Sequence, residues 1–241
     1  MLCLRAISQH SSHNMALVRG NVMQDRRRMD CVIWDFNGTL IDDLDLVVRT
    51  VNTQLAKRDL PSLTADAYRD VFGFPVEDYY RRIGVTFENE TIADLSADFF
   101  ADYAPALTAC SLHEGVVETL RQVEVRGLRQ FVLSAMEQRM LRSMISHLGI
   151  ANFFAGIYGL AHQKADSKIQ RARELARDFD IDPQTAVFIG DTDHDAEVAQ
   201  ALGMSPILIS TGHQSAGRLR AIGHPVCESY QQLSHMLSQH P

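Results

Sequence analysis

A short segment near the start of the chain, residues 30–43, constrains the fold more than any other part of the sequence. It opens with an apolar run, Cys31 to Trp34, of a length that is typical of a buried strand. Asp35 ends this run, and the turn-forming pair Asn37-Gly38 follows. A charge at the tip of a buried strand is costly unless it binds a cation or takes part in a reaction. We therefore predict that Asp35 is reactive, the alternative being a strand followed by an ordinary turn.

The rest of the chain divides into a helical stretch and a stretch in which helices and strands alternate. Residues 43–109 carry apolar residues at helical spacing, which predicts an insertion of helices over residues 44–55, 64–72, 76–83 and 91–104. Beyond residue 115, helices are expected over residues 116–125, 140–148, 167–179, 196–202 and 228–237. The expected strands are residues 31–34, 131–133, 156–160, 186–189 and 206–209. Such alternation indicates an α/β fold, a parallel sheet covered by helices on both faces.

Charge and composition exclude several classes of protein. The 241-residue chain has a formal net charge of −7, and no apolar run approaches the ~20 residues of a membrane-spanning helix. A broad nucleic-acid surface would be basic, so we expect neither a nucleic-acid nor a membrane partner. The cysteines show no CxxC pair and no metal-ligand spacing, which indicates reduced thiols and a cytoplasmic location: Cys3, Cys31, Cys110 and Cys227. The sequence carries no signal for an oligomeric state.

The first 29 residues differ in composition from the remainder. They contain five Arg and a single acidic residue, Asp25. They lack the apolar core of a secretory signal, although organellar transit peptides are also rich in Arg and poor in acids. We predict a weakly ordered leader; a true start at Met23 or Met29 is the other interpretation.

Polar residues follow several of the expected strands. In chain order they are Asp35, Asn37, Thr39, Ser134, a lysine (Lys168 or Lys164) and the segment from Gly190 to Asp195. The carboxyl ends of parallel strands meet at one edge of a sheet, so we expect these side chains to lie together. Each has a simpler explanation when taken alone: a strand-end hydroxyl, a surface lysine, or carboxylates that cap a helix. Their joint arrangement predicts a chemical site.

In order and spacing these residues resemble the signature of the haloacid dehalogenase superfamily. That signature is Asp-x-Asp-Gly-Thr-[Leu/Val], a Ser or Thr after a strand, a Lys, and Gly-Asp-x-x-x-Asp. The matching residues are Asp35-Phe36-Asn37-Gly38-Thr39-Leu40, Ser134, Lys168 and Gly190 to Asp195. The helical stretch is similar to the small α-helical cap of the phosphoglycolate phosphatase-like branch. The resemblance implies a Rossmann-like core, residues 30–42 and 110–241, with an inserted helical cap, residues 43–109, and residues 1–29 lie outside it.

The resemblance also implies a reaction, a phosphatase reaction in which Asp35 is the nucleophile and carries an aspartyl-phosphate. It implies a Mg²⁺ site formed by Asp35, the Asn37 backbone carbonyl, Asp191 and, through water or as a positioning group, Asp195. The implied phosphate-binding residues are Asp35, Thr39, Ser134 and Lys168, although Thr39 could instead only steady the turn. Lys168 is preferred over Lys164 because Ser167-Lys168 opens the expected helix. The expected substrate is a small phosphorylated metabolite, with phosphoglycolate as a family-level guess.

One residue departs from the family pattern. Related phosphatases carry an acid where this chain has Asn37, and an amide cannot act as a general acid or base. Losing that function typically costs ~10²–10⁴ in rate. Three outcomes follow: a phosphatase for esters with good leaving groups, one that takes its acid from Asp42, Asp43 or the cap, or a catalytically weak phosphate-binding or regulatory protein. The first two together are favoured over the third.

The cap is expected to set substrate specificity by closing over the phosphate. The segment after residue 72 contains the best candidates for substrate contact, Phe74, Tyr80 and Arg81, because arginine pairs well with carboxylate or phosphate. The alternative for each of them is packing between cap helices or a solvated surface charge.

Overall fold

The computed structural model describes residues 28–160 and 168–239, so the expected leader lies almost wholly outside it. At its centre is a six-stranded sheet in the order β5-β4-β1-β6-β7-β8, in which every neighbouring pair is parallel. The strands are β1 (Cys31–Trp34), β4 (Arg129–Glu137), β5 (Gly156–Leu160), β6 (Ala186–Gly190), β7 (Ser205–Ile209) and β8 (Val226–Cys227). The predicted α/β class is therefore confirmed.

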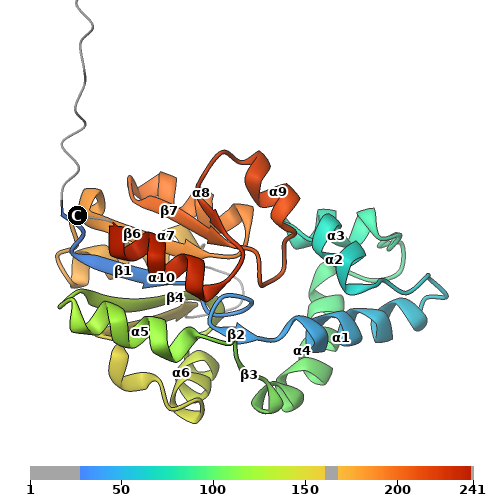
Figure 1. Cartoon of the computed structure of the whole chain (residues 1–241). Helices are drawn as coiled ribbons and strands as arrows, with labels where there is room; N and C mark the ends of the chain where they lie inside the picture. Colours follow the sequence, from blue (N-terminus) through green and yellow to red (C-terminus); the bar gives the residue numbers. More distant parts are fainter. Residues whose placement is uncertain (1–27, 161–167, 240–241) are drawn as a thin grey trace, which may run out of the picture.

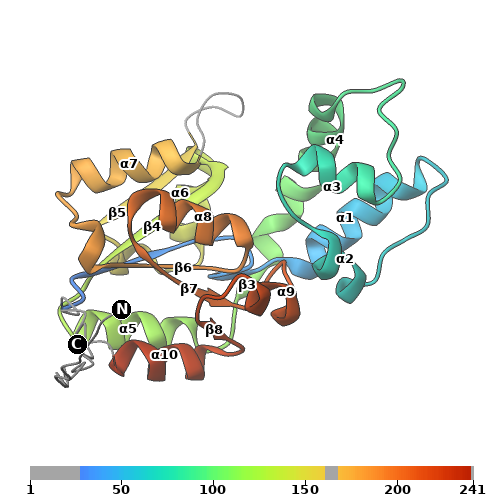
Figure 2. The same cartoon turned by 90° about the horizontal axis from the view of Figure 1, so that it is seen from above.

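Helices cover both faces of this sheet. Helices α5 (Val116–Val125) and α10 (Tyr230–Gln239) lie on one face, and α7 (Lys168–Asp178) and α8 (Asp193–Leu202) lie on the other (Figure 1 and, from above, Figure 2). The side chains of β1 alternate between these layers. Val32 and Trp34 join the cluster of buried residues that includes α5 and α10, whereas Cys31 and Ile33 join the cluster that includes α7 and α8. The apolar run therefore becomes a central strand that is buried on both sides.

The inserted helices lie beside the sheet rather than on its faces (Figure 1). Two short antiparallel strands, β2 (Ile41–Asp42) and β3 (Ser111–Leu112), form the passage out of the core and back. Between them are α1 (Leu44–Ala56), α2 (Ala65–Val71), α3 (Val76–Arg82) and α4 (Ile92–Ala106). The Thr64 hydroxyl accepts a hydrogen bond from the amide of Ala67, and Thr91 forms a capping box with Asp94. These side chains fix where the second and fourth helices begin.

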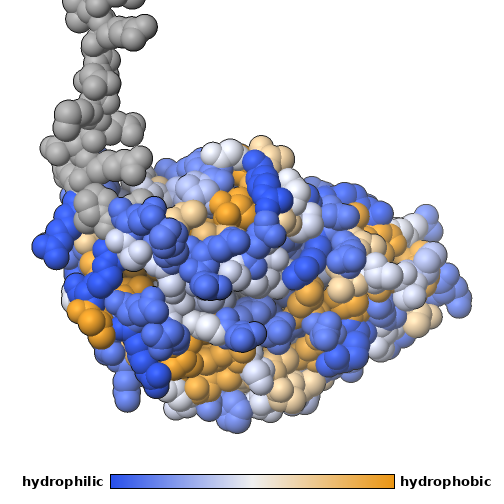
Figure 3. Space-filling model, viewed as in Figure 1, coloured by the Kyte–Doolittle hydropathy of each residue, from blue (hydrophilic) through white to orange (hydrophobic). Residues whose placement is uncertain are grey.

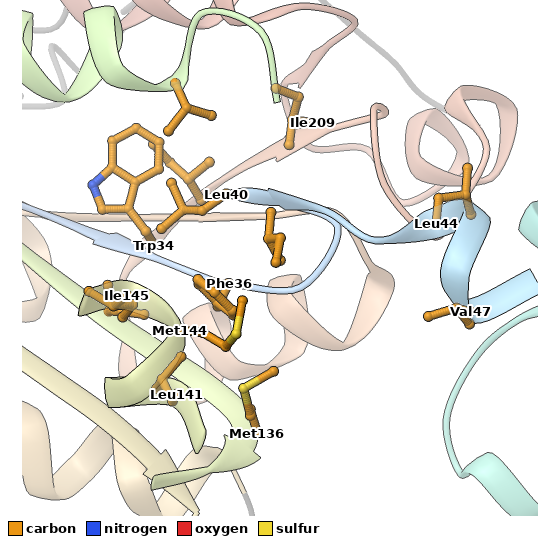
Figure 4. Close-up of a cluster of buried hydrophobic side chains, with 14 of the residues drawn as sticks. Trp34, Phe36, Leu40, Leu44, Val47, Met136, Leu141, Met144, Ile145 and Ile209 are labelled. Atoms are coloured by element: carbon orange, nitrogen blue, oxygen red, sulfur yellow. The ribbon is translucent and has the colours of Figure 1, made fainter. Parts of the chain in front are cut away.

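Phe36 determines which way its two polar neighbours face. Its side chain is fully buried and lies with Met136, Leu141 and Met144 in the core (Figure 4). Phe36 itself is absent from the cavity wall, whereas Asp35 and Asn37 on either side both line the cavity beyond the strand. This alternation is what extended backbone produces. Because Phe36 is buried in the core, the side chains of Asp35 and Asn37 both lie at the cavity.

Several boundaries differ from the predicted ones. Strand β4 is longer than expected, because Arg129 and Gln130 pair with β1 and because the strand continues past Ser134 after a shift in its register with β5. Helix α8 starts at Asp193, three residues earlier than expected. Helix α6 (Gln138–His147) starts two residues earlier than expected. Several short elements were not predicted: α9 (Ala216–Ala221), strand β8, the β2–β3 pair, and the 3-10 turns Leu107–Ala109, Ala151–Phe153 and Pro183–Thr185. These missed elements are too short to show a period. Within the described ranges, no helix has the length and apolar character needed to cross a membrane.

Candidate active site

A cavity of about 290 Å³ lies where the carboxyl ends of the strands meet the inserted helices. Its core-side wall carries Asp35, Ser134, Lys168, Asp191, Asp195 and His213. These residues follow β1, β6 and β7, lie within β4, or open α7. Its other wall comes from α1 to α4 and the segment between α2 and α3. The strand-end rule that the sequence analysis used therefore leads to this cavity.

Lys168 is paired with two carboxylates. Its Nζ donates a hydrogen bond to Oδ1 of Asp35 and another, 2.6 Å long, to Oδ1 of Asp195. All three side chains are buried. Burial alone would lower the pKa of Lys168, but Asp195 and Asp35 outweigh it and raise that pKa. The amine therefore stays charged and holds Asp35 in place. Lys164, the other lysine considered, lies outside the described residues.

Asp191 is fully buried and held from both sides. Its Oδ1 accepts a hydrogen bond from the Thr39 hydroxyl at 2.9 Å, and its Oδ2 accepts one from the backbone amide of His213 at 2.6 Å. Burial raises the pKa of Asp191 to about 6, against the lowering effect of His213. Gly38 has φ +69°, and a Cβ there would come within 2.4 Å of Oδ2 of Asp191. The glycine of the motif is needed for this close approach.

Thr39 and Ser134 differ in how they relate to the cavity. Ser134 lines it, and its Oγ accepts a hydrogen bond from the amide of Met136, which orients the hydroxyl. Thr39 is fully buried and does not line the cavity; its hydroxyl donates to Asp191 instead. The expected phosphate contact of Thr39 is therefore corrected: its buried hydroxyl is engaged by Asp191, so this side chain positions a carboxylate.

Asn37, which is half-buried, belongs to a hydrogen-bond network that joins the core to the inserted helices. Its Nδ2 donates to Oδ2 of Asp43 at 2.9 Å and to the Tyr103 hydroxyl at 2.8 Å, and Tyr103 itself donates to Asp43 at 2.6 Å. His213 Nε2 lies 3.1 Å from Oδ1 of Asp43, and His213 Nδ1 lies 3.2 Å from the Tyr68 hydroxyl. The amide of Asn37 is thus fixed by an anion and a phenol.

The residues considered as replacement acids are poorly suited to that role. Burial would raise the pKa of Asp43, but His213 and the hydrogen bonds from His213, Tyr103 and Asn37 lower it below its usual value. Asp43 is therefore an ion-paired carboxylate. Asp42 is largely exposed, lies 3.8 Å from His113 and does not line the cavity. Neither group offers a proton at the position of Asn37.

The three cap candidates have different positions. Phe74 lines the cavity and packs on His194, with ring centroids 4.8 Å apart. Tyr80 also lines the cavity, but its hydroxyl donates to Gln54 at 2.6 Å. Arg81 pairs with Glu77 at 2.6 Å, lies over the Phe87 ring and does not line the cavity, so its predicted contact with substrate is corrected. The i,i+4 spacing on α3 explains the pairing with Glu77.

The sequence analysis missed the segment after β7. Gln214 and Arg218 donate hydrogen bonds to the carbonyl of Phe72, and Arg69 on α2 donates to the carbonyls of Thr211 and Gly212. This segment, with His213, fastens the inserted helices to the core. The position of this segment directly after a parallel strand, at the sheet edge where ligands bind, could have marked it in the sequence as part of the site.

The acidic residues at the cavity form a group suited to a cation. Asp35, Asp191 and Asp195 each offer a carboxylate oxygen within 4.8 Å of the others. Burial, together with Asp195 and Asp191, raises the pKa of Asp35 well above its usual value despite Lys168. One lysine does not balance three buried carboxylates, and a hard divalent cation with oxygen ligands would. The donor set therefore fits a metal ion.

Comparisons with known proteins agree with this geometry. The sequence pattern of the haloacid dehalogenase-like hydrolases matches residues 32–209. The chain belongs to this family. The family and the Rossmann-like core that the sequence predicted are thereby confirmed, and the matched residues include Asp35, Ser134, Lys168, Asp191 and Asp195.

Individual relatives of this haloacid dehalogenase-like chain are distant. The phosphoglycolate phosphatase of Rhodospirillum rubrum is 28% identical over 195 residues, which cover 76% of this chain and 80% of that protein. A predicted phosphatase from Clostridium acetobutylicum has a TM-score of 0.74 at 20% identity, covering 88% and 99% of the two chains. The protein tyrosine kinase PtkA of Mycobacterium tuberculosis has a TM-score of 0.73 at 23% identity, with the same coverage, 88% and 99%. Family and phosphatase relatives together indicate a phosphoric monoester hydrolase, as predicted.

Proposed function

We propose that this chain is a magnesium-dependent phosphatase that hydrolyses a small phosphorylated metabolite through an aspartyl-phosphate on Asp35. The observation that carries the proposal is the pairing of buried Asp35 with Lys168 at the wall of the cavity. A carboxylate held this way keeps one oxygen on the lysine and can present the other to a phosphorus atom. Membership of the family and the named phosphatase relatives support the same reaction.

The reaction has two steps. One oxygen of Asp35 attacks phosphorus, the bond from phosphorus to the ester oxygen breaks, and the alcohol oxygen leaves with both electrons and takes a proton. Water then attacks the phosphorus of the aspartyl-phosphate and gives up a proton to solvent, the bond from phosphorus to the Asp35 oxygen breaks with both electrons on that oxygen, and inorganic phosphate leaves, which restores Asp35. Ser134 would donate a hydrogen bond to a phosphoryl oxygen, and Lys168 would supply fixed positive charge.

Magnesium would be held by Asp35, Asp191 and the backbone carbonyl of Asn37. Both oxygens of Asp195 already accept hydrogen bonds, from Lys168 and from Thr192, so Asp195 is better suited to contact through water or to positioning. The bound ion would neutralise charge on the phosphoryl oxygens and on the surrounding carboxylates. Its ligands are hard oxygens, which Mg²⁺ prefers.

We also propose that the insertion acts as a cap. Residues 43–109 would be a unit distinct from the core formed by residues 30–42 and 110–241. Phosphoglycolate is named for several relatives and is a first substrate to try. The reduced cysteines expected from the sequence support a cytoplasmic enzyme, and its acidic charge argues against nucleic acid as a partner.

The second candidate is a catalytically weak phosphate-binding or regulatory protein, which Asn37 favours because it cannot act as an acid. Hydrolysis of 4-nitrophenyl phosphate separates the two, since its leaving group needs no acid. We expect phosphate release that requires Mg²⁺, stops with a chelator and is lost in Asp35→Asn. Saturable phosphate binding by calorimetry without release would favour the second candidate instead.

A further inference from the structure

The cap-side wall of the cavity is mostly apolar; apart from its tyrosines, its polar members are Asp43, at the junction with the core, and Ser96. Its main contributors are Val47 and Val51 on α1, Phe72 and Phe74 before α3, and Phe99 and Phe100 on α4. Every residue of the insertion, 43–109, is described, and none of its Arg or Lys side chains lines the cavity. A carboxylate on the substrate's organic group would therefore meet no Arg or Lys of the insertion, and His213, which lines the cavity from the core side, is already paired with Asp43. Burying the carboxylate there would be costly.

The tyrosines of this wall add little polarity. The hydroxyls of Tyr68, Tyr80 and Tyr103 contact His213, Gln54 and Asp43 respectively. The Tyr79 hydroxyl is buried and finds no hydrogen-bond partner among the described residues. Three of these hydroxyls are therefore engaged within the protein and the fourth is buried, so the tyrosines add aromatic rather than polar character to the wall, and aromatic rings pack well against rings.

The same wall contains most of the exposed large apolar side chains of the described chain. These are Phe74 at 40%, Phe100 at 37% and Val125 at 87% exposure, and the first two line the cavity. Figure 3 shows apolar surface over the inserted helices as well as polar surface. Exposed apolar side chains gathered at a cavity are typical of a binding surface.

The core-side wall points to the same kind of substrate for an independent reason. The Asn37 amide, held by Asp43 and Tyr103, cannot protonate the departing oxygen. An alkoxide is a poor leaving group without that proton. A phenolate is a much better one, because its conjugate acid has a pKa near ~10. The bond between phosphorus and the ring oxygen would break with both electrons on oxygen, and the phenolate would take its proton from solvent.

We propose that the substrate is a phosphate monoester of an aromatic alcohol, with an apolar ring and no carboxylate, rather than phosphoglycolate. The ring would lie against Phe74, Phe99 and Phe100, and the phosphate would lie against Lys168 and Ser134. This inference rests on the proposed function, because it concerns the same cavity. It assigns recognition to the cap wall and leaving-group selection to Asn37.

The full chain with Mg²⁺ can be tested on three esters that separate these two effects. Benzyl phosphate and phosphoglycolate both have alkoxide leaving groups, so the ratio of their kcat/KM values measures how the cap-side wall recognises the organic group. We expect kcat/KM to favour benzyl phosphate at least ~10-fold, or about 1.4 kcal/mol. Phenyl and benzyl phosphate are both apolar, so their kcat ratio reports the missing acid; we expect phenyl phosphate to be faster by ~10²-fold or more. Phosphoglycolate equal to or better than benzyl phosphate would overturn the inference.

A matched pair of variants tests the wall directly. In Phe100→Arg, a cation enters the cavity mouth, and we expect the benzyl phosphate to phosphoglycolate ratio to fall roughly three- to fivefold. Val125→Arg adds the same charge at an exposed apolar position outside the cavity, and the ratio should not change. An unchanged ratio in Phe100→Arg, with the variant folded by circular dichroism, would contradict the assignment of recognition to this wall.

Failure of the inference and failure of the proposed function look different. Acetyl phosphate needs neither an acid nor a ring, so its hydrolysis with no preference for aromatic esters would overturn the inference alone. If acetyl phosphate and all aryl esters stay intact, the proposed function fails. Calorimetry with phenylphosphonate and phosphonoacetate needs no turnover and still reports the wall: tighter binding of phenylphosphonate supports the inference, and tighter binding of phosphonoacetate opposes it.

Discussion

The core-side wall of the cavity is built from charged groups that are individually fixed by hydrogen bonds, whereas the cap-side wall is built from aromatic and branched side chains. The first wall follows strand ends, so a rigid sheet positions it. The second comes from four helices and the linker before α3, which meet the core through the β2–β3 passage and the segment after β7. We therefore expect chemistry and recognition to be carried largely by separate parts of the chain.

This separation can be tested, because the two walls should respond differently to substitution. Changes to Asp35 and Lys168 in the core-side wall should lower kcat for every ester by a similar factor, whereas Asn37 should act on esters according to their leaving group. Changes in the cap-side wall should alter the ratio between esters, which is a difference in how well each is recognised.

The largest effect should come from the nucleophile. Asp35→Asn keeps the shape of the side chain but removes the attacking carboxylate, so we expect kcat to fall by at least ~10⁴ for all esters. Stopped assays of phosphate release measure this. Asp42→Asn, on the same segment but exposed and outside the cavity, should keep its activity. If Asp35→Asn remains active, the reaction does not pass through this carboxylate.

Lys168 should give the next largest loss. Lys168→Met leaves Asp35 and Asp195 without their cation, and we expect kcat to fall by ~10²–10³. The ester preference should stay the same, since the cap wall is untouched. Lys164→Met is the matched control, because the sequence offered that lysine as the alternative. A larger loss in Lys164→Met than in Lys168→Met would reassign the positive charge.

The two walls also differ in how far the sequence could predict them. The core-side residues were found because β1 reads as an unbroken apolar run and because polar residues follow β1 and β6 in a fixed order. Helix α5 and strand β1 were placed with the bounds that the structure gives them. Each of these signals is local in the chain.

The parts that could not be predicted depend on contacts distant in sequence. Thr39 is bound to Asp191, 152 positions away, so no spacing rule reveals that its hydroxyl turns from the cavity. The aromatic residues of α2 to α4 have the periodicity of ordinary helix packing, and only the fold shows which of them line the cavity. Arg81 was assigned to substrate because its chemistry suits an anion, yet its neighbour Glu77 on the same helix satisfies it.

Restoring an acid at position 37 should sharpen the contrast between esters. The Asn37 amide nitrogen lies 2.9 Å from Asp43, so in Asn37→Asp two carboxyl groups would be close enough to share a proton. We expect the new group to act as an acid and raise kcat for benzyl phosphate by up to ~10², with little change for phenyl phosphate. Asn89→Asp, an exposed change of the same charge, is the control. A loss on every ester would mean that the amide itself is required.

The smallest expected effect is on stability, and it comes from the His213–Asp43 pair, which lies where the two walls meet. Burial would lower the pKa of His213, but Asp43, Asp191 and Asp35 raise it to about 9. In the unfolded chain the histidine pKa is ~6.5. Because folding raises this pKa, the stabilisation is fully present at pH values below the unfolded-state pKa and is lost as the pH rises through the folded-state pKa. We expect the free energy of unfolding to fall by about 2 kcal/mol between pH 7 and pH 9.

Urea unfolding of the wild type and of His213→Gln at each pH measures this contribution. Glutamine cannot carry the charge, so the variant should be less stable at pH 7 and should lose the part of the pH dependence that His213 supplies. Groups that His213 does not influence titrate equally in both proteins, so their effect cancels in the difference, whereas the changed pKa values of Asp43 and Asp191 count with the pair. If the two proteins lose stability in parallel, His213 is neutral in the fold. The inserted helices would then be held to the core by the hydrogen bonds that Asn37 donates to Asp43 and Tyr103 and by the Arg69 contacts with the segment after β7.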